Sequence, residues 1–198
     1  MTSEFNPNAS RLKSLSLLAD LFGRLKIDYR LGTGALLGAI RDGDFIPWDW
    51  DVGIDIPAED LLKHWDRFLA ELSDMDFSIT YRERTWLNGK IECTDGESKF
   101  ELMGWRRDFL NNRRRRRLLI PQEIWHGSGF VELRGLNLKT YANPEQYLAH
   151  FYGNWQTPVR ATTESDKSQY MSSSVRRRDY LDCFLYVPGW LIKRITQK

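Results

Sequence analysis

Apolar residues recur at steps of three and four in two stretches of the chain, which is the spacing of one face of an α-helix. Elsewhere they alternate with polar residues, which is the two-residue period of a β-strand. In chain order these patterns predict a helix over 9–26, a strand over 27–31, a glycine turn over 32–34, one or two helical turns over 35–41, a strand over 49–56, a helix over 58–72, strands near 76–83, 88–94 and 98–105, a loop or exposed helix edge over 106–118, and a strand pair near 129–139.

The last predicted helix is marked by its ends. Asn143 suits an N-cap, Pro144 the first helical position, and Glu145 the positive end of the helix dipole. The helix is expected to reach about Tyr152 and to stop at Gly153. A helix, a strand, a helix and then mixed strands predict an α+β protein built on a sheet, not a helical bundle.

The segment 49–56 carries the first candidate chemistry. Its two faces differ: Val52, Ile54 and Ile56 lie on an apolar face, and Asp49, Asp51, Gly53 and Asp55 lie on the other. Asp49 and Asp51 are two residues apart on a predicted strand, so their carboxylates project to the same side and can share a divalent cation. Hard oxygen ligands of this kind favour Mg²⁺ or Mn²⁺.

The glycine turn ahead of this strand is a candidate phosphate site. Gly32, Thr33 and Gly34 lie between a predicted strand and a predicted helix that also contains Gly38. Glycines there let backbone N–H groups approach a phosphate closely, and a helix N-terminus adds a favourable field. The turn and the acid pair together, within a short stretch, favour a site that handles phosphates.

Arg41 lies between the turn and the acid pair. Its guanidinium can hold a donor phosphate through a bidentate contact. The alternative is a salt bridge to Asp44 or Asp49.

The length and composition of the chain are those of a soluble globular protein. The chain has 198 residues, 41% of them hydrophobic and 28% charged, which excludes a disordered chain, a collagen-like repeat and a disulfide-rich miniprotein. No apolar run approaches 18 residues, and the N-terminal segment lacks the basic and apolar regions of a secretory signal. Cys93 and Cys183 could pair, but two cysteines do not make a disulfide framework or, with three scattered histidines, a zinc site. A reducing, cytoplasmic compartment is expected.

The net charge of +2 hides an asymmetry. Residues 105–117 contain seven Arg and one Asp, and the run Arg113–Arg117 lies within them. This run either binds an anionic acceptor or lipid headgroups, or is a solvated loop. Nucleic acid is not an expected partner, because the sequence pI of about 8.5 is below the usual value of about 9 for such proteins.

Two blocks of the chain resemble the LicD family, which includes bacterial phosphocholine transferases and animal fukutin-related proteins. The first reads Gly34-Ala35-Leu36-Leu37-Gly38-Ala39-Ile40-Arg41, followed by Phe45-Ile46-Pro47-Trp48-Asp49-x-Asp51. The second reads Asn143-Pro144-Glu145-x-Tyr147-Leu148, followed by Tyr152-Gly153-Asn154-Trp155 and Pro158. The resemblance covers roughly residues 10–160.

The resemblance implies a nucleotidyltransferase-like fold, in which a mixed β-sheet flanked by helices carries a metal-binding Asp-x-Asp on a strand. It also implies metal-dependent transfer of a phospho-alcohol or sugar-phosphate, such as phosphocholine, from a nucleotide-activated donor. The donor is commonly CDP-linked, and the acceptor is a hydroxyl of a glycan precursor, as in the modification of lipopolysaccharide, capsule or teichoic acid. A catalytically inactive nucleotide- or glycan-binding module of the same fold is the alternative.

The chain departs from the family pattern at two positions. Where the family often reads Asp-Asp-Asp-x-Asp, this chain has Trp50 in the second place and Gly53 in the last. Trp50 alternates to the opposite face, but Gly53 removes one potential ligand. Glu101 lies where the family has an acidic residue before apolar ones, which makes it the candidate third acid, as metal ligand or as base. Asp55, about 7 Å further along the first strand, is the weaker candidate.

The chain is therefore expected to divide into a LicD-like domain over 1–160 and a C-terminal extension over 161–198. The extension contains an apolar run, 184–192, flanked by basic residues. It either docks on the domain, which we favour, or lies at a membrane surface, where aromatic and basic residues suit the interface. The predicted protein is a cytoplasmic enzyme, with peripheral contact to the inner membrane face as an open alternative.

Overall fold

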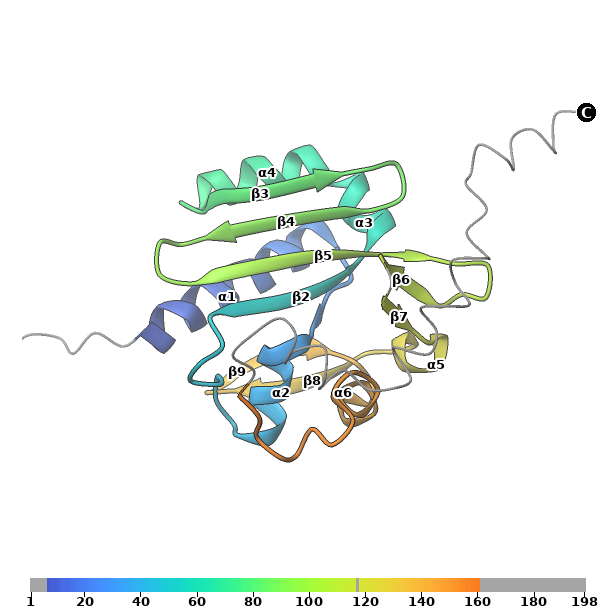
Figure 1. The fold of residues 1–198 in the computed structure, drawn as a ribbon. Coiled ribbons are helices and arrows are strands. Elements are labelled where there is room, and N and C mark those ends of the chain that lie inside the picture. Colours follow the sequence, from blue (N-terminus) through green and yellow to red (C-terminus); the bar gives the residue numbers. More distant parts are fainter. Residues whose placement is uncertain (1–6, 117, 161–198) are drawn as a thin grey trace, which may run out of the picture.

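A curled, mixed β-sheet organises the chain in this computed structural model, which describes residues 7–116 and 118–160 (Figure 1). The strand order is β1-β2-β5-β4-β3, and β6 and β7 extend the sheet from the far end of β5. The strands are β1 (Arg30–Leu31), β2 (Asp51–Pro57), β3 (Ser78–Arg84), β4 (Gly89–Thr94), β5 (Lys99–Arg107), β6 (Arg113–Arg115) and β7 (Leu118–Ile120). A separate hairpin pairs β8 (Gly129–Leu133) with β9 (Leu136–Thr140).

The pairing of β2 with β5 positions the candidate chemistry. These two strands are parallel, whereas β1 pairs with β2 and β4 pairs with β5 in the antiparallel sense. In this register Asp51 lies beside Lys99, and Gly53 lies beside Glu101. Because residues paired side by side share a sheet face, Glu101 lies on the same face as Asp51.

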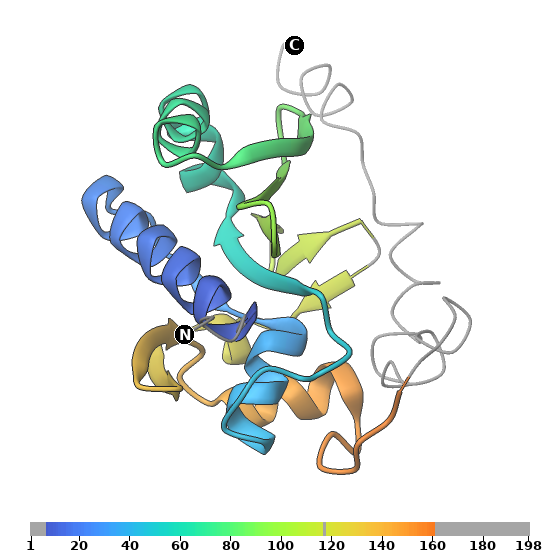
Figure 2. The ribbon, with the colours of Figure 1, turned by 90° about the vertical axis from the view of Figure 1, so that its left-hand side faces the viewer.

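Helices cover the sheet on one side and close it at one end. They are α1 (Pro7–Leu25), α2 (Thr33–Arg41), α3 (Ala58–Lys63), α4 (Trp65–Asp74), α5 (Gln122–Trp125) and α6 (Pro144–Tyr152). Figure 2 shows α1 and α4 on one side of the sheet, and Figure 1 shows α2 and α6 beside each other at the β2 end, where they are in contact.

The alternation along residues 49–56 is the reason that β2 has one fixed orientation. The side chains of Val52, Ile54 and Ile56 are 0% exposed and belong to the hydrophobic core. A shift of one residue would exchange the two faces, so burial of this apolar face fixes the acidic residues on the other face. The predicted strand is confirmed, except that it begins at Asp51 and Asp49 lies in the turn before it, with its N–H donating to the Ile46 carbonyl at 3.0 Å.

The fold class is confirmed, and so is the last helix. The Asn143 side chain accepts a hydrogen bond from the Gln146 N–H at 3.0 Å, and α6 ends at Gly153 with φ of +65°. These are the predicted N-cap and C-terminal glycine.

Two predictions about local structure are wrong, and one short helix was not predicted. Residues 106–118 are mostly not a loop or a helix edge, because β5 continues to Arg107 and the chain returns through a turn and β6 to β7. The predicted helix over 58–72 is two helices that meet at His64. The short helix α5 follows Pro121 in a segment that shows too few apolar repeats to mark it.

Several expectations fall outside the described residues, namely the extension 161–198 and Cys183 with its pairing. Cys93 is buried in β4, where burial raises the pKa of its thiol to about 12, so it does not form a reactive thiolate. Among residues 7–116 and 118–160, no helix is both long and apolar enough to span a bilayer.

Candidate active site

The glycine turn joins β1 to α2 and is held from two sides. The Gly32 N–H donates to the Gly53 carbonyl at 3.1 Å, which ties the turn to β2. The Thr33 N–H donates to the Tyr147 hydroxyl at 3.2 Å, which ties it to α6. Thr33 itself has a φ of +49°, so the chain enters α2 through a left-handed residue. The positive end of α2 is thereby fixed next to the acid pair.

Close approach explains why Gly34 is a glycine. A Cβ at Gly34 would lie 1.7 Å from Oδ2 of Asp49, so the Asp49 carboxylate rests directly on the backbone of the first turn of α2. Any side chain there would displace this carboxylate.

The same argument accounts for the acid that this chain lacks at Gly53. A Cβ at Gly53 would lie 2.0 Å from Oγ1 of Thr33, so the space of the missing ligand is filled by the threonine of the turn. An aspartate at 53 would require Thr33 to move.

Asp49 and Asp51 form a coupled carboxyl pair. Burial, together with the neighbouring Asp51 carboxylate, raises the pKa of Asp49 to about 7, and the positive charge of Arg11 opposes part of this rise. Arg11, which is 5% exposed, also donates to the Asp49 carbonyl at 3.1 Å. Two carboxylates that resist being ionised together are a suitable place for a cation, which would replace the proton.

The donor set fits Mg²⁺ or Mn²⁺ with help from a substrate. Among the residues that the structure describes, no three His, Cys, Asp or Glu side chains lie close enough to hold a metal ion. Mg²⁺ is usually held by one or two carboxylates together with water and substrate phosphates, so Asp49 and Asp51 match that pattern without a third protein ligand.

Glu101 lies on the expected face but is engaged elsewhere. Its Oε1 lies 3.2 Å from Nζ of Lys90 and 3.1 Å from Nζ of Lys99. Both lysines also contact Glu92, so the four side chains form one ion-pair network across β4 and β5. The structure therefore places Glu101 beside Gly53 while its carboxylate pairs with lysines.

Asp55 is a buried anchor that is not available as a metal ligand. It is 0% exposed and accepts hydrogen bonds from Nε1 of Trp105 at 2.6 Å, from the Tyr141 hydroxyl at 2.7 Å and from the Tyr147 hydroxyl at 3.1 Å. Burial raises the pKa of Asp55, and these three donors oppose the rise. Because Tyr147 also holds Thr33, Asp55 supports the glycine turn.

Two predicted phosphate-binding residues lie away from the turn. Arg41 is at the last residue of α2, the opposite end from the turn, and donates to Asp42 from Nε at 2.8 Å and from a terminal nitrogen at 2.6 Å. A salt bridge was the expected alternative, although its partner is Asp42. Gly38 lies mid-helix, where a Cβ would meet the Asp44 carbonyl at 2.4 Å, so it serves packing.

The arginine run has distinct environments along its length. Within the run, Arg113 contacts Glu59 and the Trp105 carbonyl, Arg114 contacts Asp108, and Arg116 contacts Glu83. Arg115 differs, because it is half-buried and its nearest charges of opposite sign include Asp55 and Glu101. Burial lowers the pKa of its guanidinium, and those carboxylates oppose the change.

Arg115 is the member of the arginine run that the structure sets apart, although the sequence could offer the run only as a whole. No side-chain hydrogen bond or ion pair joins Arg115 to another described residue, and the carboxylates whose charge acts on its guanidinium are Asp55, Glu101 and Glu83. The run itself was visible, but only the pairing of β6 with β5 separates Arg115 from its neighbours.

Tyr152 and Trp155, which belong to the second block of the family resemblance, are both partly buried against the core. Burial raises the pKa of the Tyr152 hydroxyl, and the negative charges of Asp49, Asp55 and Asp51 raise it further.

Comparison with known proteins supports the family resemblance. A family model described as "LicD/FKTN/FKRP, nucleotidyltransferase domain" matches residues 26–143, which is more than half of the chain. The chain is 38% identical over 60 residues to the lipopolysaccharide cholinephosphotransferase LicD of Haemophilus influenzae, and 33% identical over 76 residues to an uncharacterized protein of Rickettsia prowazekii. These matches cover 30% and 38% of this chain but only 23% and 28% of those relatives.

The fold is similar to that of a solved antibiotic-resistance protein. The solution structure of the antibiotic-resistance factor ANT(2″)-Ia matches with a TM-score of 0.52 at 11% identity, covering 96% of this chain and all of that one. At this identity the likeness concerns the fold alone.

Proposed function

Because the chain belongs to the LicD family, we propose that it is a metal-dependent phosphotransferase that moves a phospho-alcohol or sugar-phosphate from a CDP-linked donor to a hydroxyl of a cell-surface glycan precursor. The observation that carries the proposal is the seating of Asp49 on the backbone of Gly34, next to Asp51 and at the positive end of α2. The name of the Haemophilus influenzae relative makes phosphocholine the first donor group to test.

Each residue of the candidate site has a separate role in the proposed reaction. In the proposed reaction, the acceptor oxygen forms a bond to the donor phosphorus, the bond from phosphorus to CMP breaks, and the hydroxyl proton leaves to a base. Asp49 and Asp51 would hold a Mg²⁺ or Mn²⁺, and such a metal would offset the charge that develops on the phosphate during transfer. The first N–H groups of α2 lie beside this pair and suit a phosphate oxygen. Glu101 remains the candidate third acid, toward the metal or the acceptor hydroxyl.

The proposal is tested by turnover of a donor panel. Purified full-length protein would be incubated with CDP-choline, CDP-ethanolamine, CDP-glycerol and CDP-ribitol, with Mg²⁺ or Mn²⁺ and a glycan acceptor, and the products analysed by mass spectrometry. We expect one donor to release CMP with transfer to the acceptor, and we expect EDTA to stop the reaction. Absence of turnover with every donor would contradict the proposal.

A second candidate is an inactive binding module of the same fold. It is favoured by two observations: Thr33 fills the space of the acid that the family often has at the position of Gly53, and Glu101 is paired with two lysines. This candidate predicts binding of a CDP-linked compound with no turnover of any of them.

Replacing Glu101 with Gln should lower the rate of transfer by at least ~10²-fold if Glu101 acts as ligand or base, the usual scale for a positioned general base. The matched control is Glu92→Gln, because Glu92 contacts the same two lysines and is similarly buried, with side-chain exposure of 16% against 19%. Equal activity of the two variants would reduce Glu101 to a partner in the ion-pair network.

Replacing Arg115 with Gln should raise KM for the donor about 10-fold, since a charge-assisted hydrogen bond to phosphate contributes about 1.5–3 kcal/mol. Arg116→Gln is the control, because its side chain is 71% exposed and meets Glu83 at 3.5 Å. Steady-state kinetics at saturating acceptor measures both. A KM for Arg115→Gln equal to that of the unchanged protein would remove Arg115 from the donor site.

A further inference from the structure

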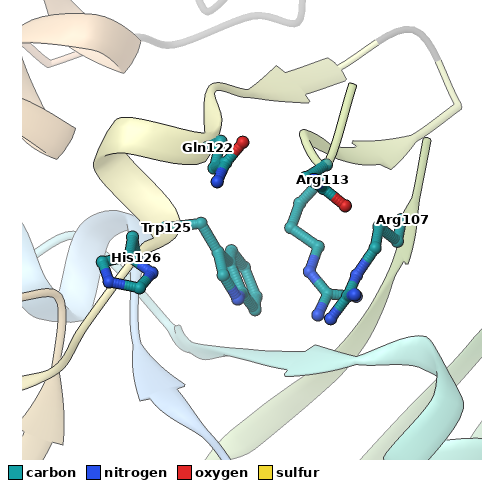
Figure 3. A pocket seen from close by; sticks show the side chains of 6 residues that line it. Arg107, Arg113, Gln122, Trp125 and His126 are labelled. Atoms are coloured by element: carbon teal, nitrogen blue, oxygen red, sulfur yellow. The ribbon is translucent and has the colours of Figure 1, made fainter. Parts of the chain in front are cut away.

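A polar pocket lies at the far end of β5 from the acid pair. It has a volume of about 250 Å³ and opens to solvent (Figure 3). Its lining residues come from the end of β5, the turn after it, β6 and α5, and they are Arg107, Asn111, Arg113, Gln122, Trp125 and His126. None of these side chains is acidic.

This pocket is separate from the proposed transfer site. Asp51 lies beside Lys99 at the start of β5, and Arg107 is the last residue of that strand. Eight residues at about 3.3 Å each put the two places about 25 Å apart along the strand. A phosphate held in this pocket is therefore not the one being transferred.

The pocket holds more positive than negative charge. The guanidinium of Arg113 donates to Glu59 at 2.8 Å and to the Trp105 carbonyl at 3.2 Å, and its side chain is only 5% exposed. Arg107 approaches the same carboxylate only to 3.9 Å, which is too long for a hydrogen bond, and its side chain is 60% exposed. Two guanidiniums thus share one carboxylate, and one positive charge is left over.

The polar side chains that line the pocket lie close together around one small volume. Figure 3 shows the guanidinium ends of Arg107 and Arg113 together beside the Trp125 ring, with Gln122 and His126 on the side of α5. Arg113 stacks at 5.1 Å from the Trp125 ring centre, and Arg30 lies over the same ring at 4.4 Å. These contacts fix the direction of the Arg113 fork, and the fork of Arg107 is free to turn toward a ligand.

We propose that this pocket binds a phosphate group, carried either by a soluble phosphate ester or by a lipid headgroup. Two guanidinium forks with amide donors match the several acceptor oxygens of a phosphate. The volume is below the range of about 300–1,000 Å³ for pockets that enclose drug-sized ligands, so the site suits a phosphate and its first attached group, not a whole nucleotide. The inference does not depend on the proposed function.

Calorimetric titration of full-length protein with inorganic phosphate tests the site. We expect saturable binding by the unchanged protein, and Arg107→Gln should raise the dissociation constant at least ~10-fold. The matched control is Arg24→Gln, because Arg24 is similarly exposed at 55% and also meets a single carboxylate, that of Glu71 at 3.0 Å, on α1. Since Arg107 is largely exposed, the variant should keep its fold, which a thermal melt checks.

Two results would overturn the proposal. One is phosphate binding that is unchanged in Arg107→Gln, and the other is no binding by the unchanged protein. Phosphate held instead at the transfer site would be lost in Arg115→Gln and kept in Arg107→Gln. That result would remove the pocket and leave the proposed function standing.

The source of the phosphate is assigned by sedimentation with phosphatidylglycerol vesicles. Loss of vesicle binding in Arg107→Gln points to a lipid headgroup, and unchanged vesicle binding points to a soluble ester.

Discussion

Replacing Asp49 or Asp51 with Asn should lower the rate of transfer by at least ~10³-fold, because a metal held there supplies several kcal/mol of charge stabilisation in the transition state. The same variants should bind Mg²⁺ more weakly, since each removes one of two carboxylates that share the candidate site. Asp74→Asn, an exposed acid at the end of α4, is the control and should match the unchanged protein. Full activity in both active-site variants would remove the acid pair from the mechanism.

The Asp49→Asn variant should also be more stable at neutral pH. The pKa of Asp49 is raised from 3.8 to about 7, so between these values the folded protein keeps a proton that the unfolded chain releases. Stability therefore falls as pH rises through that window, and the cost is fully present above pH 7. Asn carries no such charge, and removing it should raise the free energy of unfolding at pH 7.5 by about 1–2 kcal/mol after allowance for solvent screening.

The role of Asp49 and Asp51 in metal binding can also be tested without a substrate, through the effect of Mg²⁺ on the melting temperature. At pH 7.5, Mg²⁺ should raise the melting temperature of the unchanged protein, because a ligand that binds only the folded state stabilises it. Asp49→Asn and Asp51→Asn should respond much less, and Asp74→Asn should respond fully. A melting temperature that rises equally in all four proteins would place the metal elsewhere.

The sequence predicted the parts of the site that depend on local patterns. Strand β2 could be found because its apolar face alternates, and burial of Val52, Ile54 and Ile56 then decides on which side Asp51 lies. The glycine turn could be found because close contact between backbone and side chain demands glycine at position 34. Helix α6 could be found because its cap residues act within a few positions.

What the sequence could not predict depends on contacts between distant residues. Arg113 is buried together with an ion-pair partner, Glu59, that lies 54 positions earlier in the chain, at the start of α3. No local pattern could reveal this contact. A run of five arginines shows no apolar alternation, so nothing local marks 113–115 as a strand. The partners of Glu101 are likewise set by the pairing of β4 with β5, which brings Lys90 onto its carboxylate.

Asp55 is the clearest case, and replacing it with Ala should lower the free energy of unfolding by about 3–4 kcal/mol. Its donors Tyr141 and Tyr147 lie 86 and 92 positions away, so the sequence could offer it only as a weak candidate ligand. Alanine would leave three buried donors without an acceptor, each costing about 1–3 kcal/mol. Removing the carboxylate also removes the cost of burying it, which offsets part of this destabilisation. Asp55→Asn, which is uncharged and keeps one acceptor, should lose only about 1–2 kcal/mol. Urea denaturation measures both.

The two tyrosines separate the structural role of Asp55 from its role in the site. Tyr141→Phe and Tyr147→Phe each remove one hydrogen bond to Asp55, so each should lower stability by about 1 kcal/mol. Only Tyr147 also accepts the Thr33 N–H, so only Tyr147→Phe frees the glycine turn. Transfer should therefore fall about 10-fold in Tyr147→Phe and little in Tyr141→Phe, since small misplacements of binding groups carry large rate costs. Equal activity in the two variants would mean that the turn keeps its geometry without this tether, and Asp55 would then support the core and not the site.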